Sequence, residues 1–220
     1  MDYRVKNNHD FNGILIGMVL GDSYIGVNKA KTLAYLETLH KGSHKPYLIW
    51  KQRLINYKFE TTFRYKNNNG YDAFRFRTKL EKKLIYLRKD FYVNGKKRVK
   101  SNLLNRLTDL GLAIWYMDDG CLSLGRKNGR INRRNVFLNT QGFGLEGNVL
   151  IQKWLLSKYG ISSNINQNRG FRLRLNTSNT LKFIEIVSPF VNFVPCMQYK
   201  INLQYNLGSR VQEDSKRGES

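Results

Sequence analysis

The sequence has little cysteine and proline and no long apolar run. Among its 220 residues there are two cysteines and three prolines. Cys121 and Cys196 form no C-x-x-C pair and have no histidine at metal-ligand spacing, which favours free thiols in a reducing compartment. No segment approaches the ~18 uninterrupted apolar residues of a membrane span. The N-terminal residues MDYRVKNNHD contain no signal-peptide core, so we expect an intracellular protein that is neither secreted nor inserted in a membrane.

Acidic residues are also scarce. The chain has 16 Asp and Glu against 38 Lys and Arg, which gives a formal net charge of +22 and a pI near 10.1. A chain this basic repels itself unless an anionic partner compensates the charge, and no lysine-rich amphipathic helix of the kind that binds membrane surfaces stands out. Nucleic acid is therefore the expected partner. The 41% of apolar residues suffice for one large or two small domains.

Two apolar segments of the chain end in an aspartate. LIGMVLGDS covers residues 15–23 and LAIWYMDDG covers residues 112–120, and they align without gaps at an offset of 97 residues, which matches Asp22 with Asp119. FRFRTK at 74–79 and FRLRLN at 171–176 align at the same offset. Because two separate similarities share one register, we interpret the chain as a duplication of a unit of about a hundred residues.

The two units also share one predicted order of elements. Helical spacing, period-two alternation and Asn/Gly turns predict this order. The elements are a helix (10–21 and 108–119), a strand region (23–40 and 135–141), an amphipathic helix (47–57 and 148–160), a hairpin (61–79 and 163–176) and a closing helix (80–91 and 179–190). The prediction is an α+β fold of duplicated αββαββα repeats, with repeats at 1–100 and 101–207, a joint within 94–105 and a polar tail at 208–220.

Arginines alternate with apolar residues in the predicted hairpins. Period two places Phe74 and Phe76 on one face of a strand and Arg75 and Arg77 on the other. A sheet with an arginine-bearing face can lie in the DNA major groove, although a solvated strand face is the simpler alternative. The stretch GRKNGRINRR at 125–134 is predicted as a basic hairpin loop that follows phosphates, or as a mobile basic loop. The candidate DNA-binding residues are Arg64, Lys66, Arg75, Arg77, Arg126, Lys127, Arg130, Arg133, Arg134, Arg172 and Arg174.

Glycines line one face of the first apolar segment. Gly13, Gly17 and Gly21 recur every four residues, and each costs roughly 1 kcal/mol in a helix interior. Close approach of a second helix would account for them. If the two apolar helices pack together, Asp22 and Asp119 meet at the negative ends of two helix dipoles. A bound divalent cation would remove the repulsion, and hard oxygen ligands with open positions suit Mg²⁺.

With two such motifs at this separation, the chain resembles the LAGLIDADG homing endonucleases in their single-chain, two-repeat form. The resemblance extends from about residue 12 to residue 206 and is closest to the subgroup whose second motif reads W-x-M-D-D-G. It implies a pseudo-two-fold fold with the motif helices at the centre and a β-saddle over double-stranded DNA. It also implies a monomer that hydrolyses one phosphodiester on each strand of a long site, with two or more Mg²⁺ ions that Mn²⁺ can replace.

The same resemblance assigns roles to single residues. The last acid of each motif is the catalytic metal ligand, here Asp22 and Asp119. Two positions earlier the family has another acid, but this chain has Leu20 and Met117, which cannot ligate a metal. Asp118 is adjacent to Asp119 but points about 100° away on a helix, so we interpret it as a secondary or structural acid.

The family also places a lysine after the last helix of each repeat. VPCMQYK nominates Lys200 in the second repeat, and NGKKRVK nominates Lys97 in the first, with Lys96 and Lys100 as rivals. Any one of these lysines could instead contact phosphate or solvent.

A polar active-site residue is implied on the strand after each motif. By position these residues are His40 and Asn139, with Gln141 nearby. His40 could equally be an exposed strand histidine.

Three other functions fit parts of the sequence. An RNA-splicing maturase, or a DNA-binding protein that has lost cleavage, would have the same fold. The two intact aspartates and the two lysines argue against loss of cleavage, but a maturase role with RNA as partner stays open. A basic structural or ribosome-associated protein would not need aspartates at the ends of two small-residue helices.

Overall fold

The computed structural model describes residues 3–68, 71–167 and 169–204. Its two halves have the predicted αββαββα order, so the fold prediction is confirmed. The first half contains α1 (Asn8–Leu20), β1 (Tyr24–Val27), β2 (Ala34–Lys41), α2 (Lys45–Ile55), β3 (Thr61–Asn68), β4 (Tyr71–Thr78) and α3 (Lys82–Phe91). The second half contains α5 (Asp109–Asp119), β7 (Gly120–Lys127), β8 (Arg130–Leu138), α6 (Gly144–Tyr159), β9 (Asn164–Gln167), β10 (Phe171–Leu175) and α7 (Thr177–Val191).

Short elements lie between or after these helices and strands. They are η1 (Gly42–His44), β5 (Tyr92–Val93), β6 (Lys96–Lys97), α4 (Ser101–Asn105), η2 (Gln141–Phe143) and η3 (Pro195–Lys200). The predicted joint at 94–105 thus holds β6 and α4, while the boundary at residue 100 stays a prediction. The predicted tail at 208–220 and residues 69–70 and 168, in the two predicted hairpin turns, lie outside the described residues.

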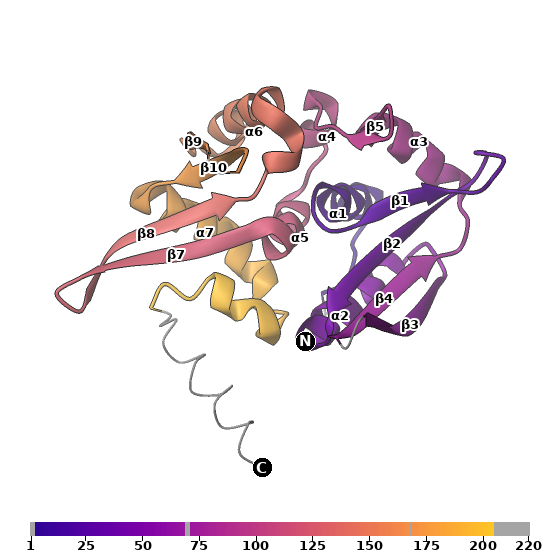
Figure 1. Cartoon of the computed structure of the whole chain (residues 1–220), viewed down its shortest axis with the longest axis horizontal. Helices are drawn as coiled ribbons and strands as arrows, with labels where there is room; N and C mark the ends of the chain where they lie inside the picture. Colours follow the sequence, from indigo (N-terminus) through magenta and orange to yellow (C-terminus); the bar gives the residue numbers. More distant parts are fainter. Residues whose placement is uncertain (1–2, 69–70, 168, 205–220) are drawn as a thin grey trace, which may run out of the picture.

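The two antiparallel sheets have matching strand orders, β1-β2-β4-β3 and β7-β8-β10-β9. Figure 1 shows α1 and α5 side by side at the centre, with one sheet on either side of them. Helices α2 and α3 pack against the first sheet, and α6 and α7 pack against the second. This arrangement is the duplicated, pseudo-two-fold architecture that the sequence repeat predicts.

Close backbone contact joins α1 to α5. A Cβ added to Gly17 would lie 2.1 Å from the carbonyl oxygen of Gly111, and one added to Gly111 would lie 2.2 Å from that of Gly13. Glycine at these positions lets the two backbones touch, as its spacing predicts. Both helices begin at a side-chain cap, because Asn7 accepts a bond from the third helical amide at 2.9 Å and Thr108 does the same at 3.2 Å.

The sheets bury one face each, as the alternation predicts. Phe76, Leu173 and Leu175 are fully buried, whereas the neighbouring arginines lie on the opposite faces. The basic stretch 125–134 was expected as a loop, but it forms the ends of β7 and β8 around a two-residue turn. Asn128 and Gly129 have φ values of 51° and 74°, the backbone of a tight hairpin turn whose twist matches the strands. This Asn-Gly pair allows the strands to run almost to the tip.

Within the described residues, no helix is both long and apolar enough to cross a membrane.

Candidate active site and nucleic-acid interface

Two carboxylates lie where the central helices end. Helix α1 ends at Leu20, so Asp22 follows it, while Asp119 is the last residue of α5. Burial, followed by the charges of Asp22 and Asp118, raises the pKa of Asp119 to about 7. Burial and then the charge of Asp118 likewise raise the pKa of Asp22. Because the charge of Asp22 raises the pKa of Asp119, the helix packing brings these two carboxylates within electrostatic range of one another.

The candidate lysines lie at these same helix ends. Lys97 Nζ donates to the carbonyl oxygen of Gly21 at 2.9 Å, and Lys200 Nζ donates to that of Gly120 at 2.9 Å. Burial lowers the pKa of both lysines, and the neighbouring aspartates oppose that shift. Of the two rivals, Lys96 is exposed and Lys100 Nζ contacts the carbonyl oxygen of a residue in α3. Among the three lysines of this segment, Lys97 therefore reaches the helix end.

A buried acid, Asp118, lies beside this pair. Its carboxylate accepts hydrogen bonds from Lys51 Nζ at 2.7 and 3.0 Å, from Tyr47 Oη at 2.9 Å and from the backbone amide of Asp22 at 3.2 Å. The side chains of Lys51 and Asp118 are 0% exposed. We expected Asp118 to be a secondary or structural acid, but the sequence did not indicate which residues bind it. A lysine within the apolar helix pattern YLIWKQRLINY was the available signal.

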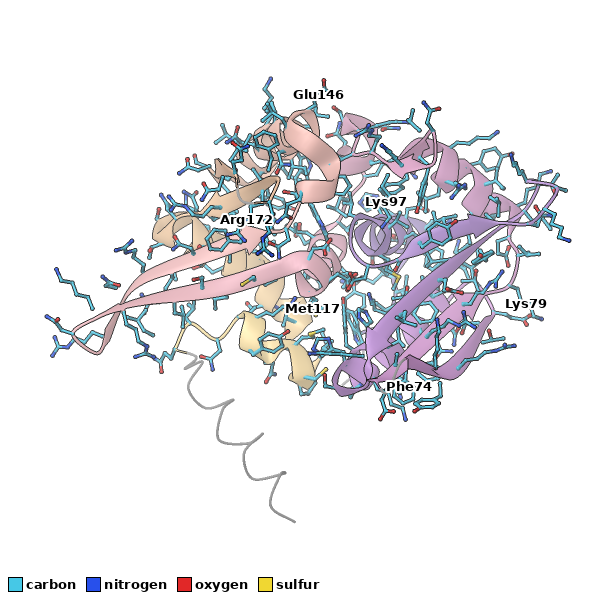
Figure 2. The ribbon with its side chains drawn as sticks, in the orientation of Figure 1. Phe74, Lys79, Lys97, Met117, Glu146 and Arg172 are labelled. Atoms are coloured by element: carbon cyan, nitrogen blue, oxygen red, sulfur yellow. The ribbon has the colours of Figure 1, made fainter. Side chains whose placement is uncertain are left out.

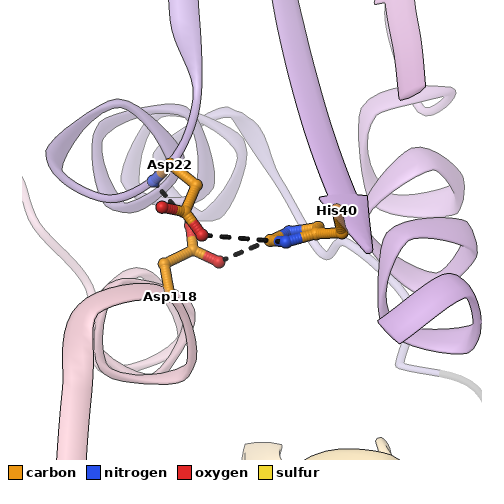
Figure 3. A group of neighbouring side chains, drawn as sticks. All are labelled: Asp22, His40 and Asp118. Atoms are coloured by element: carbon orange, nitrogen blue, oxygen red, sulfur yellow. Dashed lines mark hydrogen bonds and ion pairs between the residues drawn. The ribbon is translucent and has the colours of Figure 1, made fainter. Parts of the chain in front are cut away.

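His40 lies inside the protein rather than on its surface. Its side chain is 6% exposed, with Nδ1 3.7 Å from Asp22 and Nε2 3.7 Å from Asp118, distances too long for hydrogen bonds. Burial, followed by the charge of Lys51, lowers the pKa of His40 to about 2, so the imidazole is neutral. Figure 3 shows the three side chains converging from α5, β2 and the end of α1.

The polar candidates of the second repeat occupy other places. Strand β8 ends at Leu138, so Asn139 and Thr140 follow the strand, Asn139 half-buried and Thr140 buried. His40, by contrast, lies within β2, so the two candidates differ in their local structure, and a shared role for them stays a prediction. The amide of Asn139 donates to the carbonyl oxygen of Asp119 at 3.1 Å. Gln141 begins η2 and is half-buried.

The residues at the helix ends fit a divalent cation at Asp22 and Asp119. Two carboxylates with raised pKa values repel one another, and the Asp22 side chain is 43% exposed, so it is open to an ion or a phosphate. Atoms of Asp22, His40 and Asp118 also lie within 4.8 Å of one another. However, Lys51 already binds both oxygens of Asp118, and its positive charge disfavours a cation there. The fit therefore holds for Asp22 with Asp119.

Aromatic rings contact two arginines, one on each sheet. The Arg77 guanidinium lies 3.3 Å from the centre of the Tyr35 ring, and that of Arg172 lies 4.3 Å from the centre of the Phe137 ring. Such stacking orients the guanidinium plane. Figure 2 labels Arg172 on the second sheet and Lys97 near the molecular centre.

The arginine-bearing face of the first sheet includes all four candidates there: Arg64, Lys66, Arg75 and Arg77. Arg64 pairs with Arg75 across neighbouring strands, and Lys66 pairs with Ala73, so all three basic residues share one face. Arg75 also forms an ion pair with Glu37 at 3.4 Å. A basic face of this kind suits a polyanion.

In the second sheet, strand alternation separates two neighbouring candidates. Arg133 shares the face of Arg172 and Arg174, whereas Arg134 lies on the other face, half-buried, with no partner for its Nε among the described residues. Both were expected to contact DNA, and the register places Arg134 away from that face. The remaining candidates of this hairpin are exposed near its tip: Arg126, Lys127 and Arg130.

Comparison with known proteins decides the family. The model of the LAGLIDADG DNA endonuclease family matches residues 12–183. The chain belongs to this family. Among solved structures, the LAGLIDADG chain is similar to the homing endonuclease I-WcaI bound to its DNA recognition sequence, with 26% identity and a TM-score of 0.76 over 93% of this chain and 90% of that one.

Curated relatives of this LAGLIDADG protein have different functions. It is 29% identical over 201 residues to the RecA protein of Mycobacterium gastri, covering 86% of this chain and 46% of that protein. It is 27% identical over 202 residues to the cytochrome b mRNA maturase bI2 of Debaryomyces hansenii, covering 86% of this chain and 72% of the maturase. The chain thus spans about half the length of the RecA protein that it matches.

Proposed function

We propose that this LAGLIDADG protein is a monomeric, sequence-specific endonuclease that cuts both strands of double-stranded DNA with Mg²⁺. One observation carries the proposal: the paired helices bring two partly buried carboxylates, Asp22 and Asp119, to one place between two arginine-bearing sheets. A binding protein would not need to hold two mutually repelling acids with raised pKa values there. The similarity to a DNA-bound homing endonuclease over nearly the whole chain supports the same function.

The arginine-bearing faces would bind the duplex. Arg64, Arg75 and Arg77 on one sheet and Arg172 and Arg174 on the other alternate with inward apolar residues, so their guanidinium groups can contact guanine edges or phosphates. Lys66, Arg133 and the tip residues Arg126, Lys127 and Arg130 would add phosphate contacts. Since two sheets contribute, the site read should be long.

The residues at the helix ends would perform the hydrolysis. Asp22 and Asp119 would hold Mg²⁺, or Mn²⁺ in its place, which when bound neutralises phosphate charge and lowers the pKa of a coordinated water. Lys97 and Lys200 would each place an ammonium beside one carboxylate, where it can stabilise negative charge on the phosphate. Both lysines are held by helix-end carbonyl groups, so their ammonium groups are positioned before DNA binds.

The experiment selects cleavable sites from a random duplex library with Mg²⁺ or Ca²⁺ and then compares variants on the selected site. Asp22→Asn and Asp119→Asn should abolish double-strand cleavage while DNA affinity is retained. Glu146→Gln, which changes an exposed acid on α6, should cut like the parent. Either aspartate variant cutting both strands at the parental rate would refute the site.

A maturase is the second candidate, because a maturase is among the similar proteins. The same preparation should be tested for stimulation of intron splicing in vitro. Splicing activity without cleavage of any library duplex would favour the maturase over the endonuclease.

A further inference from the structure

The Asp118 carboxylate makes more contacts than a buried acid needs for neutrality. Its Oδ1 accepts from Lys51 Nζ and Tyr47 Oη, and its Oδ2 accepts from Lys51 Nζ and from the amide of Asp22. The approach is so close that a Cβ on Gly21 would lie 2.5 Å from Asp118 Cβ. Helix α5 thus contacts the chain directly after the end of α1, at Gly21 and Asp22.

Burying the Lys51–Asp118 ion pair costs free energy of desolvation. Desolvation of a buried ion pair can exceed its attraction, and apolar residues of similar volume often serve stability as well or better. A cation at Asp118 is also disfavoured, because Lys51 contacts both of its oxygens. Neither stability nor cation binding therefore accounts for the arrangement. The other contact of Asp118 is the hydrogen bond that the Asp22 amide donates to it, and this bond connects the ion pair to a proposed metal ligand.

The two halves of the site differ in this support. Asp119 is the last residue of α5, whereas α1 ends at Leu20, two residues before Asp22. Asp119 is therefore held by helical hydrogen bonds, whereas Asp22 lies outside its helix. At the repeat offset the position of Asp118 corresponds to Gly21, which has no side chain. The first repeat consequently has no carboxylate at this position that could accept a hydrogen bond from the Asp119 amide.

We infer that Asp118, held by Lys51 and Tyr47, is a positioning residue that orients Asp22 and so supports cleavage of one DNA strand more than the other. The inference rests on the proposed endonuclease function. Displacement of a catalytic group by about 1 Å can slow a reaction roughly 100-fold. Loss of the hydrogen bond to Asp22 should therefore slow cleavage of the strand that depends on Asp22, so that nicked DNA accumulates.

Two double variants test the bond separately from the buried charge. Lys51→Met with Asp118→Leu removes the ion pair and the acceptor, while Lys51→Met with Asp118→Asn removes the ion pair but keeps an oxygen that can accept from the Asp22 amide. Leucine and asparagine side chains branch at the same atom and have the same number of heavy atoms, so the two proteins differ in the carboxamide group, whose oxygen can accept from the Asp22 amide. Thermal unfolding and DNA affinity are measured for each, and both strands of a cleavable duplex are labelled.

With the leucine variant, one strand should be cut roughly 10- to 100-fold more slowly relative to the other than in the parent. The asparagine variant should restore most of the parental ratio. If both doubles cut the two strands in the parental ratio, Asp118 is only structural and the inference fails. Equal loss on both strands in the leucine variant would overturn it as well.

If the doubles do not fold, Tyr47→Phe provides the test, because it removes one bond to Asp118 and leaves the ion pair. The strand ratio should then move away from the parental value, and an unchanged ratio would refute the inference. A parent that cuts no duplex would instead refute the endonuclease function itself. A parent that cuts, with unchanged ratios in the variants, refutes only the positioning role.

Discussion

Replacing Asp119 by asparagine should stabilise the cation-free protein while removing its activity. Burial and the charges of Asp22 and Asp118 raise the pKa of Asp119 from 3.8 to about 7. An acid whose pKa is higher in the folded state binds more protons there, so stability falls as pH rises from about 4 to about 7 and stays reduced above that range. Asparagine has no charge to bury and escapes this penalty.

The shift sets the size of the effect. A rise in pKa from 3.8 to about 7 corresponds to about 4 kcal/mol, and solvent around the partly exposed carboxylate reduces this to about 1–3 kcal/mol. For a chain of this size each kcal/mol shifts the melting temperature by about 2–4 °C. Asp119→Asn should therefore melt about 2–12 °C above the parent at pH 8.5 with EDTA.

The assay is thermal unfolding of parent and variant between pH 4.5 and pH 8.5 with EDTA. The difference in melting temperature should be greatest at pH 8.5 and clearly smaller at pH 4.5, because the folded carboxyl group is protonated there. Glu185→Gln, which changes an exposed acid on α7, should show no such trend. If Asp119→Asn melts below the parent at pH 8.5, or if the difference does not depend on pH, the carboxylate is not under electrostatic strain and the reasoning fails.

Three further substitutions test other parts of the structure. Gly17→Val should lower the free energy of unfolding in urea by about 3 kcal/mol or more, because the added carbon meets the Gly111 carbonyl group. Gly142→Ala, which meets nothing within 4 Å, should change it by less than about 0.5 kcal/mol, and equal effects would contradict the helix contact. Arg75→Ala should cost roughly 1–3 kcal/mol of binding and relax preference at one base pair; parental selectivity in a binding selection would exclude base readout. Lys200→Met should slow cleavage roughly 100-fold or more, and a parental single-turnover rate would remove this lysine from the proposed site.

Much of the fold could be predicted because local patterns specify it. The repeat offset of 97 residues, the alternation in FRFRTK and FRLRLN and the glycine spacing of the first motif each predict contacts that the structure contains. The stretch 125–134 was misjudged, since its glycines and basic residues are typical of loops. In fact pairing with a partner strand lets the same residues extend β7 and β8, and cross-strand pairing is not visible in local composition.

The sequence by itself determined the duplication, the order of elements in each half and the two aspartates that end the motifs, because period and spacing along one chain encode them. Only the tertiary structure decided that Asp118 binds Lys51, Tyr47 and the Asp22 amide, that His40 is buried, and that Arg134 lies apart from Arg133. These contacts join residues as many as 96 positions apart. Their partners depend on how helices and strands pack and in which register, and packing and register are properties of the folded chain.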